Sequence, residues 1–217
     1  MSSNRSVKGN FVYNNIEKTG KNFMYKNFDR SNCYNCNFSN SNFNYTSLRG
    51  AHFKSCDFFK CTFKWAEFIG TNLKGSDFKS ALFEDAIFDS VNLAGVDFKD
   101  AQFINTIFLS TDIKCAKNFA VNTPGIKIYE EMPEVEMSTE LETAITNVMD
   151  NKYVKKSRVL DTKTGGINII NIMILLEHFD EETLIKGLNL IETELDCDFY
   201  TLSYLIKFLK KNMELNQ

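Results

Sequence analysis

The sequence contains few of the residues from which catalytic and metal sites are usually built. Its 217 residues include two histidines, His52 and His178, and neither has cysteine or histidine partners at metal-site spacing. The sequence also lacks a glycine-rich phosphate loop and the turn that presents a nucleophilic serine in many hydrolases. We therefore expect no enzyme activity, no cofactor and no bound metal ion.

Hydrophobic segments that would direct a chain into or across a membrane are also missing. No apolar run reaches the length of a membrane span, and the first residues, MSSNRSVKGN, have no signal-peptide character. The six cysteines do not suggest a disulfide framework, because most of them fall at positions of a sequence repeat that are expected to point inward. We predict a cytoplasmic protein without a membrane partner, whose cysteines are mostly small core residues.

A strict five-residue period runs from Lys21 to Cys115, through nineteen pentads without an insertion. The third residue is Phe in fourteen pentads, the first is small in seventeen, and the second is Asn or Asp in eleven. This period fits neither a helix face nor the alternation of a long strand. The first and third residues are expected to point inward from a short extended segment, and the second outward. The last two residues turn a corner, which suits the glycines found at several fifth positions.

This tandem A(D/N)Lxx pattern, with Phe largely in place of the central Leu, resembles the pentapeptide-repeat family. The resemblance implies a β-solenoid, a right-handed quadrilateral β-helix with four pentads per coil, in which residues spaced by twenty stack in columns. Nineteen pentads then make about five coils, or roughly 23 Å at about 4.8 Å per coil. Cys36 and Cys56 would stack on adjacent coils. We interpret them as core residues, with a regulatory thiol pair as the alternative.

The segments that flank the repeat have other predicted structures. Two out-of-register pentads, centred on Phe11 and Ile16 and followed by a two-residue insertion at Thr19–Gly20, are expected to cap the N-terminal end. After the repeat, a Glu-rich stretch with both prolines predicts an exposed linker. A C-terminal α-helical domain follows. The predicted segments are residues 1–20 (cap), 21–115 (β-helix), 116–136 (linker) and 137–217 (helical domain).

Three to four helices are expected in the C-terminal domain. Thr139 and Glu142 have the spacing of a capping box at the start of the first helix. Ile167–Phe179 is apolar nearly all round and is predicted to be the buried centre of the domain. Asp180 and Asp198 are expected to cap the two helices that follow.

Charge is distributed unevenly along the predicted rod. Residues 21–65 hold seven basic and two acidic residues, a net charge of +5, whereas residues 66–115 have a net charge of −4. The basic half is a candidate surface for nucleic acid or another anionic partner, although we consider direct nucleic-acid binding the weaker hypothesis. Its candidate residues are Lys21, Lys26, Arg30, Arg49, Lys54, Lys60 and Lys64.

Three aspartates spaced by twenty are predicted to form an acidic column. Lys79 and Lys99 each stand two residues after one of these aspartates and should partly neutralise the column. Some members of the family that the sequence resembles mimic duplex DNA and bind DNA gyrase or topoisomerase IV. The resemblance therefore implies a partial DNA mimic, limited to the C-terminal half of the rod. The acidic column consists of Asp57, Asp77 and Asp97.

Apolar residues gather at outward positions near the C-terminal end of the predicted rod. A contiguous exposed apolar patch usually marks an interface. Its occupant could be the protein's own helical domain, a foreign protein or a second copy in a homodimer, and we favour the helical domain. Four candidates are expected on one face and two on the adjacent face: Ile69, Ile87, Ile107 and Leu109, then Leu82 and Ile104.

The leading hypothesis is a cytoplasmic, non-enzymatic protein-interaction module. The β-helix would be its rigid half, and the helical domain would contribute dimerisation or partner recognition. A type II topoisomerase such as DNA gyrase is the most specific partner that the resemblance implies. The alternatives are binding of nucleic acid or an anionic surface through the basic half, or a role as a structural scaffold or effector.

Overall fold

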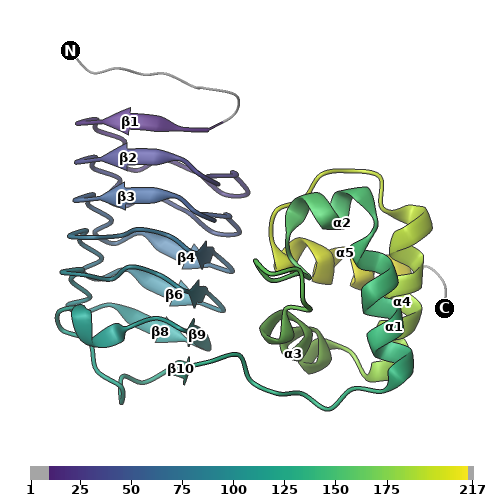
Figure 1. Ribbon diagram of the computed structural model, residues 1–217. Coiled ribbons are helices and arrows are strands. Elements are labelled where there is room, and N and C mark those ends of the chain that lie inside the picture. Colours follow the sequence, from purple (N-terminus) through teal and green to yellow (C-terminus); the bar gives the residue numbers. More distant parts are fainter. Residues whose placement is uncertain (1–9, 215–217) are drawn as a thin grey trace. The chain divides into compact units, whose positions relative to one another are not determined.

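The computed structural model describes residues 10–214 (Figure 1). The chain divides into two compact units, Met1–Glu131 and Met132–Gln217. Across residues 10–214, no helix is both long enough and apolar enough to span a lipid bilayer. The first unit contains the repeat and the second unit contains the helices.

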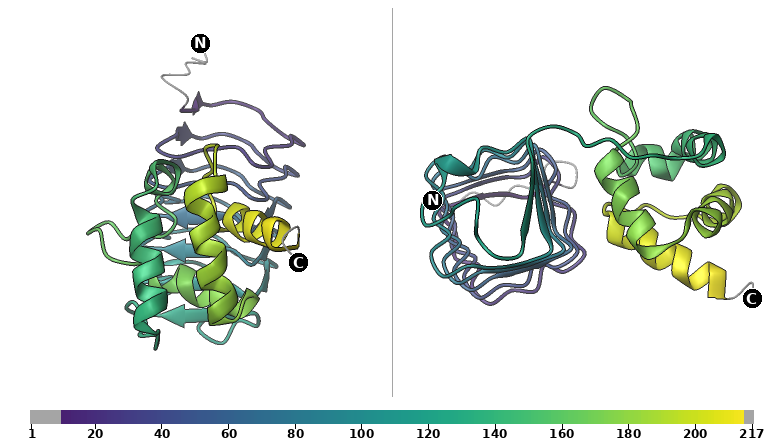
Figure 2. Two further views of the ribbon diagram at one scale, coloured as in Figure 1. Left: turned by 90° about the vertical axis from the view of Figure 1, so that its right-hand side faces the viewer. Right: turned by 90° about the horizontal axis from the view of Figure 1, so that it is seen from below.

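The first unit is a β-solenoid of about six turns, with four sides when it is viewed along its axis (Figure 2). Each turn takes twenty residues, because each strand pairs in parallel with the segment twenty residues further along the chain. We number the sides in chain order, and each side lies one pentad after the previous one. Face 1 carries β1 (Val12–Asn14), β2 (Asn32–Tyr34) and β3 (His52–Lys54).

The other three faces are built in the same way. Face 2 is a ladder of single bridges that runs from Glu17 through Asp77 to Lys117. Face 3 carries β4 (Thr62–Lys64), β6 (Leu82–Glu84) and β8 (Gln102–Ile104). Face 4 carries β5 (Glu67–Ile69), β7 (Ile87–Asp89), β9 (Thr106–Leu109) and β10 (Ile126–Tyr129).

Phenylalanine rings fill the interior of the solenoid in columns, which confirms the predicted fold. The rings of Phe63 and Phe83 are stacked with their centroids 5.0 Å apart, and Phe83 continues to Phe103 at 5.1 Å. On face 4, Phe68 and Phe88 stack at 4.5 Å. Burying one such side chain stabilises the fold by about 2–3 kcal/mol, and ring pairs add about 1 kcal/mol. The repeated phenylalanines are therefore the main source of stability in this unit.

Small residues at the first positions of the pentads do more than leave space for the rings. Their hydroxyl and thiol groups donate hydrogen bonds to main-chain carbonyls of the preceding turn. Thr71 Oγ1 lies 2.8 Å from the carbonyl oxygen of Leu48, and Ser76 Oγ lies 2.7 Å from that of Phe53. These bonds tie successive turns together from inside the corner.

The second residue of a pentad decides how its corner is built. Where it is Asn or Asp, the side-chain oxygen usually accepts a hydrogen bond from the main-chain N–H two residues on, as Asn72 does from Lys74 at 3.1 Å. The same bond joins Asp77 to Lys79 at 2.8 Å. This local bond competes with extended pairing, so these pentads mostly form a bridge and a turn. The strands β3 to β9 all have another residue type at this position.

Every fifth residue from Asn15 to Ser110 has a positive φ angle, and fifteen of these twenty residues are not glycine. An L-residue in this left-handed conformation costs about 1 kcal/mol relative to glycine. The stacking of the turns evidently offsets this cost at each corner. Where the fifth residue is glycine, as the sequence suggested for a corner, this conformational cost is avoided.

We expect Gly70→Ala to lower the free energy of unfolding by about 1 kcal/mol. Gly70 has φ +59°, and an added Cβ would meet nothing within 4 Å, so the cost is conformational rather than steric. Urea denaturation followed by circular dichroism would measure it. Ser80→Ala is the control, because Ser80 already has a side chain at φ 56°. Equal losses for the two variants would contradict the argument.

The N-terminal pentads are in register with the rest, so the predicted insertion at Thr19–Gly20 is wrong. Tyr13 pairs with Cys33, and Glu17 bridges Asn37, which keeps the step of twenty. Phe11 and Ile16 therefore occupy first positions, not the centres of pentads. The Phe11 ring lies 4.5 Å from the ring of Phe28, and this packing accommodates a large side chain in the end turn. Residues 1–9 of the predicted cap lie outside the described residues.

The segment predicted as a linker is largely part of the solenoid. β10 pairs with β9 over four residues, and Lys117 bridges Asp97 in the register of twenty. The Phe119 ring packs 5.0 Å from Phe98 and 5.1 Å from both Phe103 and Phe108, so it covers the ends of three ring columns. After Cys115 the third residue of each pentad is no longer regularly Phe or Leu. The repeat that is visible in the sequence therefore ends before the solenoid does.

Five helices are found among the described residues of the second unit, where three to four were predicted. α3 contributes several fully buried aliphatic side chains, as its apolar sequence predicts, whereas α4 is the helix that contacts α1, α3 and α5. α1 packs along α4, and α4 also contacts α5 (Figure 2). The helices are α1 (Thr139–Met149), α2 (Lys152–Ser157), α3 (Ile169–His178), α4 (Glu181–Glu194) and α5 (Leu202–Glu214).

The helix caps agree only in part with the prediction. Asp180 caps α4, accepting a hydrogen bond from the Thr183 N–H at 2.9 Å. Ser138, not Thr139, caps α1. Asp198 caps no helix and instead forms an ion pair with Lys156, because α5 begins four residues later.

Candidate protein-binding surfaces

Face 4 carries most of the candidate apolar residues in two adjacent columns, which we call the apolar columns. Ile87 and Ile107 are paired in β7 and β9 and form one column. Ile69 and Leu109 belong to the second, with Asp89 between them. The four residues therefore share one sheet, as their spacing predicts. Ile87, Ile107 and Leu109 are nevertheless buried, at 4%, 7% and 3% exposure, so they are not an open surface of the structure. Their role as an interface stays a prediction.

The two candidates on face 3 do not extend these columns. Leu82 pairs with Thr62 and Gln102, so it has polar neighbours along its column. Ile104 lies in the other outward column of the face beside Glu84 and is 51% exposed. Leu82 and Ile104 are single apolar residues in a polar surface, which is ordinary for a soluble protein.

The acidic column is present on face 2, where Asp57 bridges Asp77 and Asp77 bridges Asp97. Each aspartate uses one carboxylate oxygen to accept a main-chain N–H two residues on. The free oxygens of two of them meet the same cation. Lys79 Nζ lies 2.6 Å from Asp77 Oδ2 and 3.4 Å from Asp97 Oδ2. This confirms the predicted neutralisation by Lys79.

Electrostatics within the column follow from these contacts. Partial burial acts to raise the pKa of Asp97. The pKa of Asp97 is nevertheless lowered, because the Asn118 side chain and the Lys99 N–H donate hydrogen bonds to its carboxylate and Lys79 lies nearby with a positive charge. The pKa of Lys79 is raised by its bonds to Asp77 and then to Asp97. The lowered pKa keeps Asp97 ionised at neutral pH, and the positive charge of Lys79 lies between Asp97 and Asp77.

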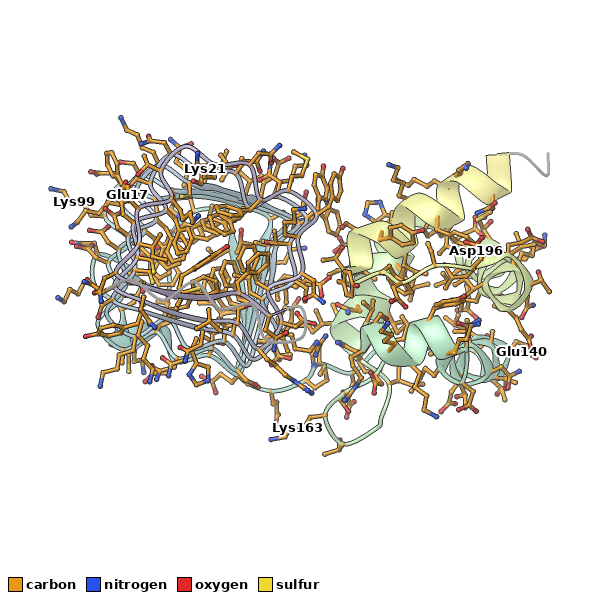
Figure 3. The ribbon with its side chains drawn as sticks, turned by 90° about the horizontal axis from the view of Figure 1, so that it is seen from above. Glu17, Lys21, Lys99, Glu140, Lys163 and Asp196 are labelled. Carbon is orange, nitrogen blue, oxygen red and sulfur yellow. The ribbon has the colours of Figure 1, made fainter. Side chains whose placement is uncertain are left out.

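The seven basic candidates do not form one surface. Lys21 and Lys64 are on face 3, Lys26 and Arg49 on face 4, and Lys54 on face 1. Lys64 Nζ is paired with Glu84 Oε1 at 2.5 Å. Figure 3 shows one of the seven, Lys21, on a different side of the tube from Lys99, a further basic residue on face 2. A surface that tracks a nucleic-acid backbone needs its cations on one side, so this arrangement does not support direct nucleic-acid binding.

One aromatic feature was missed from the sequence. The rings of Tyr25 and Tyr45 stack 4.9 Å apart at the corner between faces 3 and 4, and Trp65 occupies the next position of that column. Tyr25 is 60% exposed. The spacing of twenty was the available signal, because it stacks fifth positions as well as central ones.

Two family models match the repeat region. One, described as pentapeptide repeats (8 copies), matches residues 36–75, and the other, described as pentapeptide repeats (9 copies), matches residues 58–107. No curated protein sequence matches the chain. Both model matches lie inside the solenoid and do not concern the helical unit.

Several solved structures are similar to this chain at low identity. The pentapeptide repeat protein Rfr23 from the cyanobacterium Cyanothece 51142 is 15% identical, with 56% of this chain and 88% of that chain covered and a TM-score of 0.26. A pentapeptide repeat protein from the Arabidopsis thaliana thylakoid lumen is 18% identical, with coverages of 73% and 88% and a TM-score of 0.20. A trypsin-treated form of QnrB1, a plasmid-mediated fluoroquinolone resistance protein, is 13% identical, with coverages of 54% and 90% and a TM-score of 0.17.

Proposed function

The repeat region of this chain belongs to the pentapeptide-repeat family, and on that premise we propose that the protein is a non-enzymatic protein-interaction module. The apolar columns carry the proposal. They place Ile87 above Ile107, and Leu109 beside them, at outward positions of a rigid sheet, where all three side chains are buried outside the ring core. Outward positions elsewhere on the rod are mostly polar, so the apolar columns are not needed to form the solenoid.

The solenoid suits this role because it is rigid. Successive turns share main-chain hydrogen bonds and a continuous ring core, so its surface loses little conformational entropy when a partner binds. The helical unit is proposed to contribute a second recognition surface or a homodimer contact. The proposal places the protein in the cytoplasm, since all six cysteines are free thiols, as expected of a reducing compartment.

The most specific version of the proposal is that the partner is a type II topoisomerase, with face 2 acting as a partial mimic of duplex DNA. The regular acidic column supports it, because carboxylates at fixed spacing on a rod resemble a phosphate backbone. Lys79 limits the mimicry to a short stretch, since it bridges Asp77 and Asp97. Removing the charge of Lys79 therefore tests this version of the proposal.

If face 2 binds a topoisomerase, the purified protein should inhibit DNA supercoiling by gyrase at micromolar concentration. Lys79→Met should strengthen the inhibition several-fold, because it removes the cation from the column. Asp97→Asn should weaken it while keeping the corner, since asparagine at this position makes the same main-chain bond at Asn72 and Asn92. Inhibition should fall as salt is raised.

Asp100→Asn is the matched control, because it removes the same charge from a corner residue with positive φ, a conformation that asparagine adopts readily. It should change inhibition much less than Asp97→Asn does. An unmodified protein without effect on supercoiling would end the topoisomerase version. The broader proposal would then rest on the apolar columns alone.

A further inference from the structure

Two cysteines lie one above the other inside face 2. Cys36 and Cys56 are both first residues of their pentads, and the residues that follow them, Asn37 and Asp57, are bridged in parallel. Their side chains have matching environments, since Cys36 Sγ lies 3.3 Å from the Tyr34 carbonyl oxygen and Cys56 Sγ lies 3.5 Å from that of Lys54. Neighbouring parallel segments are about 4.8 Å apart, which is within the Cα separation that a disulfide bond spans.

The two thiols also influence each other electrostatically. The pKa of Cys36 is lowered, mainly by the neighbouring Cys56 thiol. Main-chain hydrogen bonds to the Cys36 sulfur act in the same direction. The pKa of Cys56 is raised, first by the neighbouring Cys36 side chain and then by burial. One member of the pair is therefore the better thiolate and the other holds the proton, as in reactive dithiols.

We propose that Cys36 and Cys56 are a redox-active dithiol that peroxides oxidise to a disulfide bond between adjacent turns of the solenoid. The Cys36 thiolate attacks the O–O bond of a hydroperoxide ROOH, forming a sulfenic acid and, after protonation, the alcohol ROH (water when R is H). The Cys56 thiol, losing its proton, then attacks the Cys36 sulfur. An S–S bond forms and the hydroxyl group leaves as water. Two thiols are oxidised, one peroxide is reduced, and a dithiol reductant reverses the step.

Access to the pair depends on the end of the solenoid. Cys36 and Cys56 are each 2% exposed, so the closed structure shields them from solvent. Cys36 lies directly beneath the half-turn formed by residues 11–20, through the bridge between Glu17 and Asn37. End turns of a solenoid open more readily than inner turns, because each turn is stabilised by its neighbours. Opening of this half-turn would admit a molecule as small as a peroxide.

Cys61 is an internal control for this chemistry. It is also a first residue in the same turn of the solenoid as Cys56 and is fully buried, with its thiol 3.0 Å from the Phe38 carbonyl oxygen. The residues twenty before and after it are Ser41 and Ala81, so it has no thiol neighbour in its column. Burial raises the pKa of Cys61 to about 12. We therefore expect Cys61 to stay reduced.

The test uses the full chain carrying Cys115→Ser and Cys197→Ser, which remove the two exposed thiols. This protein is treated with hydrogen peroxide. Remaining thiols are then alkylated after unfolding, and the protein is analysed by intact mass and peptide mapping. We expect a loss of two hydrogen atoms, a single linked peptide pair joining Cys36 to Cys56, and full recovery with dithiothreitol. Oxidised protein should also melt at a higher temperature, because the bond ties two turns together.

Cys36→Ser and Cys56→Ser should each abolish the linked peptides. Both variants should fold, because serine is accepted at first positions, where Ser76 makes the equivalent bond to a carbonyl. Circular dichroism checks this, and the linkage in the parent protein decides the question independently. The proposal is overturned if Cys36, Cys56 and Cys61 all remain alkylatable after peroxide treatment. It is also overturned if Cys36 passes to a sulfinic acid without linkage to Cys56.

Discussion

Phe83→Ala is expected to lower the free energy of unfolding by about 4 kcal/mol, within the usual range for losing a buried aromatic side chain. Phe83 is fully buried, and its ring stacks on Phe63 at 5.0 Å and on Phe103 at 5.1 Å. Each turn of a solenoid is stabilised by its two neighbours, so one missing ring weakens two interfaces. The ordered columns leave little freedom for other rings to refill the space.

Urea denaturation would measure this loss, with two variants as controls. Phe59→Ala removes the same side chain from an outward position that is 36% exposed, and should cost less than about 1 kcal/mol. Phe83→Leu should cost about 1–1.5 kcal/mol, since leucine is the central residue at Leu73 and Leu93 of the same solenoid. Similar losses for Phe83→Ala and Phe59→Ala would mean that the ring columns do not stabilise the fold as described.

Gly125→Ala is expected to detach the last strand of the solenoid and to cost about 3 kcal/mol or more. An added Cβ would lie 1.9 Å from the carbonyl oxygen of Phe103, and Gly125 has φ +81°. Neither the close approach nor the backbone angle suits a side chain. Gly125 accepts a hydrogen bond from the Thr106 N–H at 2.9 Å as the chain returns to face 4. Displacing it therefore removes the start of β10 from β9.

Hydrogen exchange would locate the effect. The amide of Thr106 and that of Ser110, which donates to the Tyr129 carbonyl at 2.8 Å, should lose protection, while inner turns keep theirs. Gly165→Ala is the control, because Gly165 has φ +87° but no atom within 4 Å of an added Cβ. It should cost only about 1 kcal/mol. Equal effects at the two glycines would show that the contact with Phe103 is unimportant. Because β10 is the last strand of face 4, Gly125→Ala should also weaken the binding of any partner that contacts the apolar columns.

Most of the solenoid interior was predictable because the same pattern of large and small residues recurs in pentad after pentad. A large central residue and a small first residue two positions earlier can both be buried only in a short extended segment. The spacing of twenty then follows from four such segments per turn. It correctly placed Ile87 above Ile107 and Asp77 above Asp97. The predicted contact of Lys79 with this aspartate column also follows from that register.

The ends of the solenoid were predicted poorly because no repeat constrains them. The sequence frame placed Phe11 at the centre of a pentad, whereas the register of hydrogen bonds assigns that place to Tyr13. Phe119 and Gly125 are unremarkable in the sequence, yet one covers three ring columns and the other permits the return of β10. Two of the three predicted helix caps, at Thr139 and Asp198, were misplaced for a related reason, since several polar residues near a helix start can fill the same role.

The five-residue period by itself determined which side chains fill the tube and which point outward. Only the tertiary structure decided how far the tube extends, and that the basic residues Lys21, Lys54 and Lys64 lie on more than one face. It also showed that the Cys36 and Cys56 thiols are buried, each beside a main-chain carbonyl oxygen. The physical reason is that a side chain in the repeat is buried or exposed according to its position within its own pentad. Surfaces and ends arise instead from residues twenty or more positions apart, whose meeting depends on the closed register of the whole solenoid.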